Sequence, residues 1–276
     1  MRHITVLLCL AFLLAGNASG QTRDQKELVL DFEGNKIFRT QQLLDVADKC
    51  LAQQNQSRDR NDAGDLDYCL RKIRSFLFGK GYLRAKIGEP RRQETSNAIR
   101  VIVPIEEGAL YRLGKVEIKG AELFTRQHLL EMLSLKTGDV ATGEAILAWL
   151  DGKVKCSYAD HGYIQFSYAA DTYFRPGSDD GSDAVVDLSV EIDEGQRFTI
   201  RSINFEGNGS VPEDDLRRKM QVSTGDVFNK ELFDDSLRRI DQTGQFEKID
   251  VDKDVDYRSA EKSPRLDLTI HLRRKN

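Results

Sequence analysis

Three short runs of alternating apolar and polar residues recur along the chain, and each run ends at a glycine. The runs are 28–34, 115–120 and 201–207, so their closing glycines are 86 and 87 residues apart. Alternation over such a length is typical of a strand with one buried face. The regular spacing therefore predicts three copies of one structural unit.

Two segments with helical spacing of apolar residues follow each of these strands. The first begins at Thr40, Thr125 or Pro212, which are residues that suit a helix start. The second segments are 66–78, 143–160 and 230–242, and closing apolar runs follow at 99–106, 185–193 and 265–272. With a further strand after each second helix, the pattern predicts an α+β fold of three tandem β-α-α-β-β modules. Each is a three-stranded sheet covered by two helices.

The first twenty residues have the pattern of an export signal. Arg2 precedes an apolar run from 4 to 14, and the small residues Ala18 and Gly20 follow it. This run is shorter than the about 20 apolar residues that span a membrane, so we expect cleavage after Gly20. The modules are then expected at 21–108, 109–195 and 196–276.

The charge balance and the motifs favour a binding protein over an enzyme. The formal net charge of −4 argues against nucleic acid as a partner, because phosphate contacts favour a basic surface. The chain carries no Gly-x-Ser-x-Gly sequence, phosphate-binding loop or nucleotide fingerprint, and its histidines lack metal-ligand spacing. We therefore expect no catalysis and no cofactor.

One acidic stretch invites comparison with a calcium loop. Asp250, Asp252, Asp254 and Glu261 match its positions 1, 3, 5 and 12, but Val255 stands where the loop requires glycine. The aspartates also alternate with apolar or basic residues, as on the solvent face of a strand. This interpretation is preferred, and no metal site is expected.

The cysteines leave two alternatives open. Cys50 and Cys69 flank a polar stretch within the first module, so an oxidising compartment would allow a disulfide between them. Spacing alone does not fix the geometry, and two separate thiols remain the equal alternative. Cys156 lies near Leu150 and Val154 in a helical pattern and is expected to be a buried structural thiol.

Several short motifs then point to a family. Phe-Glu-Gly-Asn occurs at 32–35 and 205–208, Thr-Gly-Asp-Val at 137–140 and 224–227, and Gly-Tyr at 81–82 and 162–163. With the β-α-α-β-β order, these motifs resemble POTRA domains, and the tandem is similar to the periplasmic arm of BamA-type outer-membrane assembly factors. The first copy departs through an insertion at 52–65 and lacks the Thr-Gly-Asp turn. The chain ends at Asn276, directly after the last strand, so we expect it to lack the β-barrel.

The resemblance implies that the second strand of each module is an exposed edge. Such an edge binds other polypeptides by β-augmentation, the addition of a strand through backbone hydrogen bonds. The candidate binding residues are Leu83, Ala85, Ile87, Ile164, Phe166, Tyr168, Phe246, Ile249 and Val251.

The expected partners are unfolded outer-membrane proteins or a barrel-bearing assembly factor. The expected location is the periplasm, in association with the outer membrane, with membrane contact only through a partner. The alternative is an envelope scaffold anchored by a retained N-terminal segment, as in the division protein FtsQ, which also carries a POTRA-type module. A mass measurement of the mature protein discriminates the two.

Overall fold

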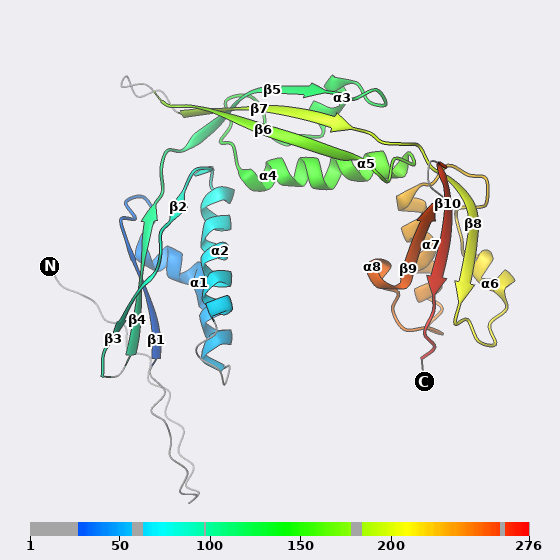
Figure 1. The fold of residues 1–276 in the computed structure, drawn as a ribbon, viewed down its shortest axis with the longest axis horizontal. Helices are drawn as coiled ribbons and strands as arrows, with labels where there is room; N and C mark the ends of the chain where they lie inside the picture. Colours follow the sequence, from blue (N-terminus) through cyan, green and yellow to red (C-terminus); the bar gives the residue numbers. More distant parts are fainter. Residues whose placement is uncertain (1–26, 57–62, 97, 178–183, 260–262, 276) are drawn as a thin grey trace, which may run out of the picture.

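The computed structural model describes residues 27–56, 63–96, 98–177, 184–259 and 263–275, with side chains omitted at 27–28, 49–56 and 63–65. The predicted export signal lies outside these residues. Three sheets follow one another along the chain and form an arch, with the second module across the top (Figure 1). None of the helices in these ranges is long and apolar enough to cross a membrane.

Module 1 pairs its first and last strands in parallel. Its elements are β1 (Glu27–Glu33), α1 (Thr40–Gln56), α2 (Ala63–Gly79), β2 (Lys86–Ile87), β3 (Arg91–Glu94) and β4 (Ala98–Glu106). β4 lies centrally, with β1 parallel on one side and β2 and β3 antiparallel to it. β2 and β3 together occupy the place of the second strand. The core includes Leu43, Ile73, Leu77 and Val101, which are fully buried between helices and sheet.

Module 2 repeats this plan with a longer sheet. Its elements are β5 (Tyr111–Lys119), α3 (Arg126–Glu131), α4 (Gly143–Leu147), η1 (Ala148–Val154), α5 (Lys155–Asp160), β6 (Ser167–Arg175) and β7 (Ala184–Asp193). The strand order is β5-β7-β6, with β5 parallel and β6 antiparallel to β7. α4, η1 and α5 form one continuous helix in which η1 is a π-helical stretch. Trp149 on η1 is buried and donates from Nε1 to Leu129 O at 2.8 Å.

Module 3 follows the same plan, with a short additional helix, α8, before its second strand. Its elements are β8 (Thr199–Glu206), α6 (Glu213–Arg217), α7 (Lys230–Asp241), α8 (Val251–Asp254), β9 (Val255–Ser259) and β10 (Arg265–His271). The strand order is β8-β10-β9. Phe198, Phe228, Phe233 and Phe246 are buried in its core. The predicted α+β fold of three sheets, each covered by helices, is confirmed.

The glycine that closes the first strand of each module is required by a close backbone approach. A Cβ on Gly120 would lie 2.1 Å from Ile192 O, and one on Gly207 would lie 2.1 Å from Leu272 O. Both glycines also have a positive φ, of 77° and 78° respectively, which other residues rarely adopt. The first strand therefore turns away directly over the end of the third.

The acidic residue that precedes the next module fixes the loop after this glycine. Glu107 accepts hydrogen bonds from the backbone N–H groups of Lys36, Ile37 and Phe38 at 2.7–2.9 Å. Glu194 accepts in the same way from the N–H groups of Glu122 and Leu123. Since these carboxylates satisfy donors of a loop about 70 residues away, they close each module at its end.

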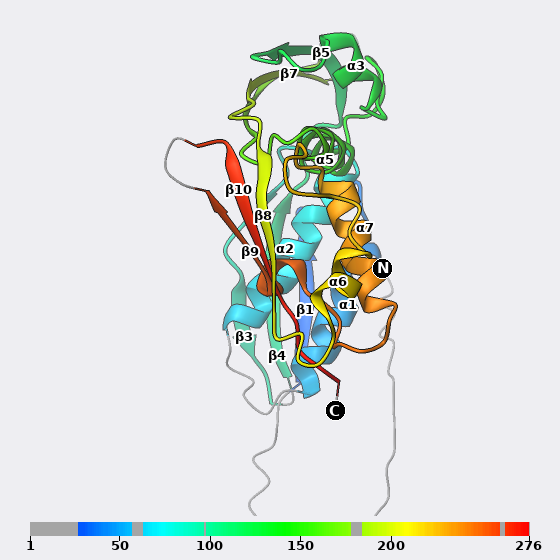
Figure 2. The same ribbon diagram turned by 90° about the vertical axis from the view of Figure 1, so that its right-hand side faces the viewer.

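The modules are joined by contacts as well as by the chain. At the first junction, Gly143 at the start of α4 is seated on the ring of Phe78 in α2. At the second, Asp160 Oδ1 accepts from Glu231 N at 2.8 Å, at the start of α7. The continuous helix of module 2 thus contacts a helix of each neighbour, and helices line the inner side of the arch (Figures 1 and 2).

Candidate functional site: the sheet edges

In modules 2 and 3, the outer edge of the first strand is covered by the Thr-Gly-Asp-Val turn. Leu113 N donates to Asp139 O at 2.9 Å, and Gly138 N donates to Leu113 O at 2.8 Å. In module 3, Ile200 N donates to Asp226 O at 2.8 Å, and Gly225 N donates to Ile200 O at 2.7 Å. The repeated motif is therefore a short backbone cover for β5 and β8 as well as a turn between helices.

An arginine extends this cover along each edge. Arg126 Nη2 donates to Val116 O at 2.7 Å, and Arg217 Nη2 donates to Ile203 O at 2.9 Å. Arg126 is the first residue of α3 and Arg217 is the last residue of α6, so the two helices supply the arginine from opposite ends. Sequence reasoning missed them, because an arginine on a short helix gives no sign that it binds a strand carbonyl.

The opposite edge of module 2 is open. β6 is the last strand of its sheet and pairs along all nine residues with β7 alone. Within the described part of the chain, no backbone hydrogen bond outside that ladder involves Ser167–Arg175. Seven of the nine residues are exposed, and only Tyr168 and Phe174 are half-buried. β6 therefore presents a backbone edge about 30 Å long to any strand that approaches it.

Both ends of β6 are held firmly to the module. Tyr168 Oη donates to Asp151 at 2.6 Å, and desolvation together with this bond raises the pKa of Tyr168 to about 12. At the other end, Phe174 packs edge-on against Tyr111 with 4.8 Å between ring centroids. Its ring also lies under the guanidinium of Arg84 from module 1. An edge held at both ends is pre-organised for strand addition, because little backbone entropy remains to be lost.

A salt bridge fixes the position of the last residue of β6. Arg175 binds Asp187 on β7 through two hydrogen bonds of 2.9 and 3.0 Å. The Arg175 guanidinium holds the pKa of Asp187 below its ordinary value, and that of Arg175 is raised in return. The same carboxylate accepts from Lys115 N at 2.6 Å, where β5 shifts its register.

The other two modules offer shorter open edges. In module 3, β9 is the terminal strand of five residues, and among the residues that the structure describes it pairs only with β10. In module 1, β3 is a four-residue strand whose side chains are all exposed. β6 is therefore the longest second-strand edge that the structure describes.

The second strands begin later than the sequence pattern predicted. Of the nine candidate binding residues, only Ile87 and Tyr168 lie in strands, β2 and β6. Five of the others lie in turns or loops or begin a helix: Leu83, Ala85, Ile164, Ile249 and Val251. Phe166 and Phe246 are buried, at 7% and 1% exposure, so they belong to the cores of their modules. The strands instead lie further along the chain, as β3 at Arg91–Glu94, β6 at Ser167–Arg175 and β9 at Val255–Ser259.

This correction has a physical cause. After the helix, Phe166 N bonds back to Tyr163 O and Ala85 N to Tyr82 O, so these segments are turns that fill the core. Their apolar residues alternate with polar ones as they would in a strand, which explains why the sequence pattern placed the strands too early. β6 itself is exposed on both faces, so it carries no hydrophobic period to detect.

Two further expectations are corrected. Asp254 is not on a solvent face: it is 2% exposed at the end of the helical turn α8. It accepts from Arg273 at 2.5 and 3.0 Å, which lowers its pKa. Cys156 is exposed and not buried, because the buried face of α5 is formed by Tyr158 and Ala159.

The two alternatives for Cys50 and Cys69, a disulfide or two separate thiols, both stay predictions. The Cys50 side chain lies outside the described residues, while Cys69 is buried on α2. Glu261, the last residue of the calcium-loop pattern, also lies outside them.

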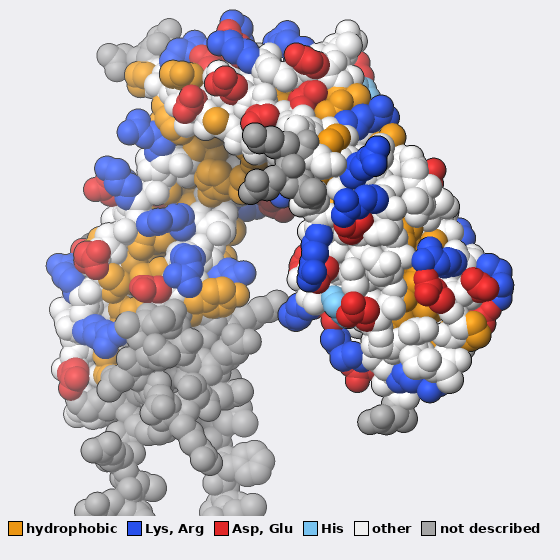
Figure 3. Space-filling model, turned by 45° about the vertical axis from the view of Figure 1, so that its right-hand side comes forward, with side chains coloured by type: hydrophobic (Ala, Val, Ile, Leu, Met, Phe, Trp, Pro, Cys, Tyr) orange, Lys and Arg blue, Asp and Glu red, His pale blue; other side chains and the backbone are white. Residues whose placement is uncertain are grey.

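Charged side chains of both signs are interspersed over the face of the molecule in Figure 3. Elsewhere in the structure, charged side chains form ion pairs along helices, such as Arg217 with Glu213 and Lys230 with Asp234. Such a mixed surface produces no strong field of one sign on this face. On this face, long-range electrostatic attraction would therefore contribute little to the binding of a partner.

Comparison with known proteins identifies the family. Residues 111–195 and 198–275 match the POTRA family, described as surface antigen variable number repeat. The chain belongs to the POTRA family. The crystal structure of POTRA domains 3–5 of Haemophilus influenzae BamA is similar to it, with a TM-score of 0.67 and 21% identity. The likeness covers 90% of this chain and 96% of that one, so the fold extends to all three modules.

Two curated relatives carry the name outer membrane protein assembly factor BamA. The protein of Nitratidesulfovibrio vulgaris is 24% identical over 79% of this chain and 26% of its own length. The protein of Neisseria meningitidis is 21% identical over 81% of this chain and 28% of its own length. The chain thus spans about a quarter of the length of these relatives.

Proposed function

We propose that the chain is a periplasmic polypeptide-binding protein that assists the assembly of outer-membrane proteins, and that it acts by binding and not by catalysis. The observation that carries this proposal is the open nine-residue edge of β6, on the opposite side of the sheet from the covered edge of β5. The membership of the chain in the POTRA family and its similarity to proteins named as assembly factors support the proposed cellular role.

The chemistry of the open edge suits varied clients. Alternate residues of an edge strand direct both N–H and C=O outward, so about four or five residues of β6 can bind an added strand. Every polypeptide carries these backbone groups. The side chains of Ala169, Ala170 and Asp171 at the centre of β6 offer little to distinguish one client sequence from another. The free-energy cost of ordering the client offsets part of the gain from these hydrogen bonds. We therefore expect dissociation constants in the micromolar to millimolar range.

The partner is proposed to be an unfolded outer-membrane protein or a barrel-bearing assembly factor that offers a strand. The chain itself would associate with the outer membrane through that partner. Small residues at Ala170 and Thr172, on the helix side of β6, leave room for the side chains of the added strand. Because this binding is weak and broad, it favours transient holding over permanent assembly.

Site-specific photo-crosslinking in cells tests the proposal. A crosslinking residue at Ala170 on β6 is expected to capture outer-membrane proteins or an assembly factor. The matched control is Lys119, which is also exposed but lies on the other edge strand, β5. Equal capture at both positions, or no envelope protein captured at Ala170, would overturn the proposed use of this edge.

A second variant tests whether the backbone edge is responsible. Lysines that replace both Ala170 and Thr172 place charge where the added strand must pack, which is how natural edge strands resist pairing. Both positions are exposed, so the fold should persist. Loss of capture from a crosslinker at Ala169, with unchanged circular dichroism, is the expected result.

A further inference from the structure

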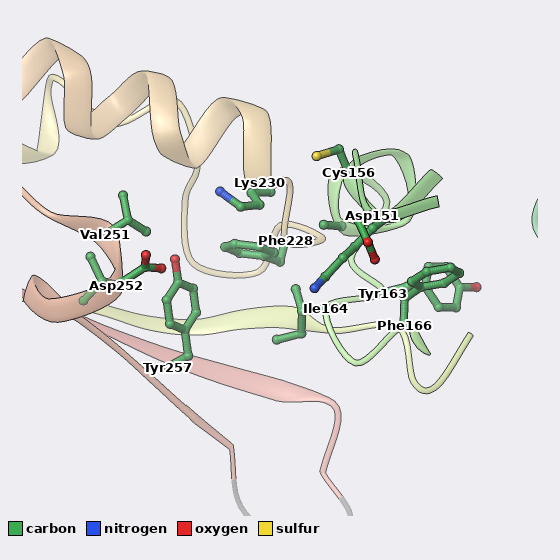
Figure 4. Close-up of a pocket in the computed structure, with 13 residues that line it drawn as sticks. Asp151, Cys156, Tyr163, Ile164, Phe166, Phe228, Lys230, Val251, Asp252 and Tyr257 are labelled. Carbon is green, nitrogen blue, oxygen red and sulfur yellow. The ribbon is translucent and has the colours of Figure 1, made fainter. Parts of the chain in front are cut away.

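A groove of about 760 Å³ lies at the junction of modules 2 and 3. Module 2 contributes the end of its long helix and the segment that leads to β6, with Ile164 and Phe166. Module 3 contributes Phe228, Val255 and Tyr257. Figure 4 shows Tyr257 extending from β9 toward Phe228, with Ile164 on the opposite wall. This volume falls within the range of about 300–1,000 Å³ that is typical of ligand sites.

The groove is held open by the contacts of the junction. Asn229 Nδ2 donates to Asp160 O at 2.8 Å, and Phe198 N donates to Gly162 O at 2.9 Å. Ile164 of module 2 also packs against the core of module 3. Since these bonds fix both walls, a ligand does not have to assemble the site.

One wall of the groove is the helix-side face of an open strand. Val255 and Tyr257 alternate along β9, so they face the same side, and both line the groove. Tyr257 is still 38% exposed, although it contacts Phe228 and Phe233 edge-on or nearly so. No backbone hydrogen bond from the described residues covers the outer edge of Val255–Ser259.

A strand added to β9 would therefore direct every second side chain into this groove. Residues two apart on a strand are separated by about 7 Å, and neighbouring strands bring opposite Cβ atoms to about 5 Å. The aromatic and aliphatic walls fit two apolar side chains in this arrangement.

The two walls also carry charges of opposite sign. Lys155 on the module 2 wall and Asp252 on the module 3 wall both line the groove, and neither forms an ion pair with another described residue. By contrast, Lys230 pairs with Asp234, and Asp151 accepts from Tyr168. An acidic residue at one end of the bound segment and a basic residue at the other would complement these two groups.

We propose that this groove selects client segments. Its ligand is an extended polypeptide with two apolar side chains at alternate positions, flanked by an acidic residue for Lys155 and a basic residue for Asp252. The inference rests on the proposed function in that the ligand is an extended polypeptide. It adds a second binding edge, β9, and a side-chain preference that the backbone edge of β6 does not provide.

The probe is a synthetic capped peptide, Glu-Thr-Phe-Thr-Val-Thr-Lys, titrated against the full chain by fluorescence anisotropy. Cys156→Trp fills the groove from an exposed helix position, and we expect about tenfold weaker binding or more. Leu147→Trp is the matched control, because Leu147 is exposed on the same continuous helix but does not line the groove. Circular dichroism verifies that both variants are folded.

A charge exchange tests the role of Lys155. A second peptide has lysine in place of its glutamate, and the unmodified chain is expected to bind it several-fold more weakly. Lys155→Glu should reverse this preference, a result that nonspecific apolar binding would not give.

Two outcomes separate this inference from the proposed function. If binding of the first peptide is lost in the double lysine variant of β6 but unchanged by Cys156→Trp and Lys155→Glu, the groove inference fails and β6 remains the binding edge. If crosslinking at Ala170 captures no envelope protein while the peptide still requires the groove, the proposed use of β6 fails and the groove stands. No measurable binding of the first peptide also overturns the groove.

Discussion

Gly143 provides a test of the junction between modules 1 and 2 in which two physical effects have opposite signs. It is the first residue of α4, and its φ is not in the left-handed region. Helix propensity alone predicts that Gly143→Ala stabilises the chain by up to about 1 kcal/mol. A Cβ at this position, however, would lie 1.7 Å from the ring of Phe78, so the ring or the whole module must move.

The packing term is the larger one. Extra carbon in a filled contact typically costs about 1–3 kcal/mol, so we expect a net destabilisation of about 1–2 kcal/mol. Gly152→Ala is the matched control on the same helix, because a Cβ there meets nothing within 4 Å. That variant should be neutral or stabilised by about 0.5–1 kcal/mol.

Trp149 makes the assay specific. It is the only tryptophan in the chain and is buried in module 2, so its fluorescence reports the unfolding of that module. For a unit of this size, each 1 kcal/mol shifts the melting temperature by about 4–8 °C. Small-angle scattering would show whether Gly143→Ala also changes the angle of the arch. Equal stabilisation by both alanines, with an unchanged scattering profile, would refute the proposed seating on Phe78.

Three other predictions concern single modules. Glu107→Gln weakens the acceptor of three backbone N–H groups and should cost about 1–3 kcal/mol, visible as faster hydrogen exchange in the loop after β1. Arg201 and the Ser202 hydroxyl hold the pKa of Asp267 at about 2, so Asp267 stabilises module 3 above pH 4 and loses this effect as the pH falls toward 2. Arg201→Met should therefore lower the melting temperature at pH 7 by a small amount and have less effect at pH 2, and an equal drop at both pH values would contradict this assignment. If Cys50 and Cys69 are bridged, reduction should destabilise module 1 by about 3 kcal/mol, and intact-mass analysis of the alkylated chain decides whether the bond exists.

The three-module fold could be predicted because the glycines that mark the end of each first strand are required by the geometry of the backbone. Gly120 and Gly207 recur since a side chain there would collide with the carbonyl at the end of the third strand. The closing strands β7 and β10 alternate between buried and half-buried residues, so their pattern is strong. Such features reflect local sterics and burial, which a single sequence records directly.

The open edge of β6 was harder to predict for the same physical reason that leaves it open. β6 packs little of its surface, so its residues show no alternation, whereas the buried Phe166 before it does suggest a strand. The cover formed by Arg126 depends on a contact with Val116 across the module. The exposure of Cys156 depends on which face of a partly π-helical segment meets the core.

The covered edges of β5 and β8 also limit how copies of the chain can associate. A sheet that is open on both sides can accept neighbours repeatedly, which is the geometry of a growing fibre. In modules 2 and 3, the Thr-Gly-Asp-Val turn and its arginine close one side, so each sheet can join a single neighbour. Contact through β6 or β9 is therefore self-terminating: it can produce a pair, but it cannot propagate through the far side of the sheet. A protein that exposes edges to capture unfolded chains would gain protection against its own polymerisation from this asymmetry.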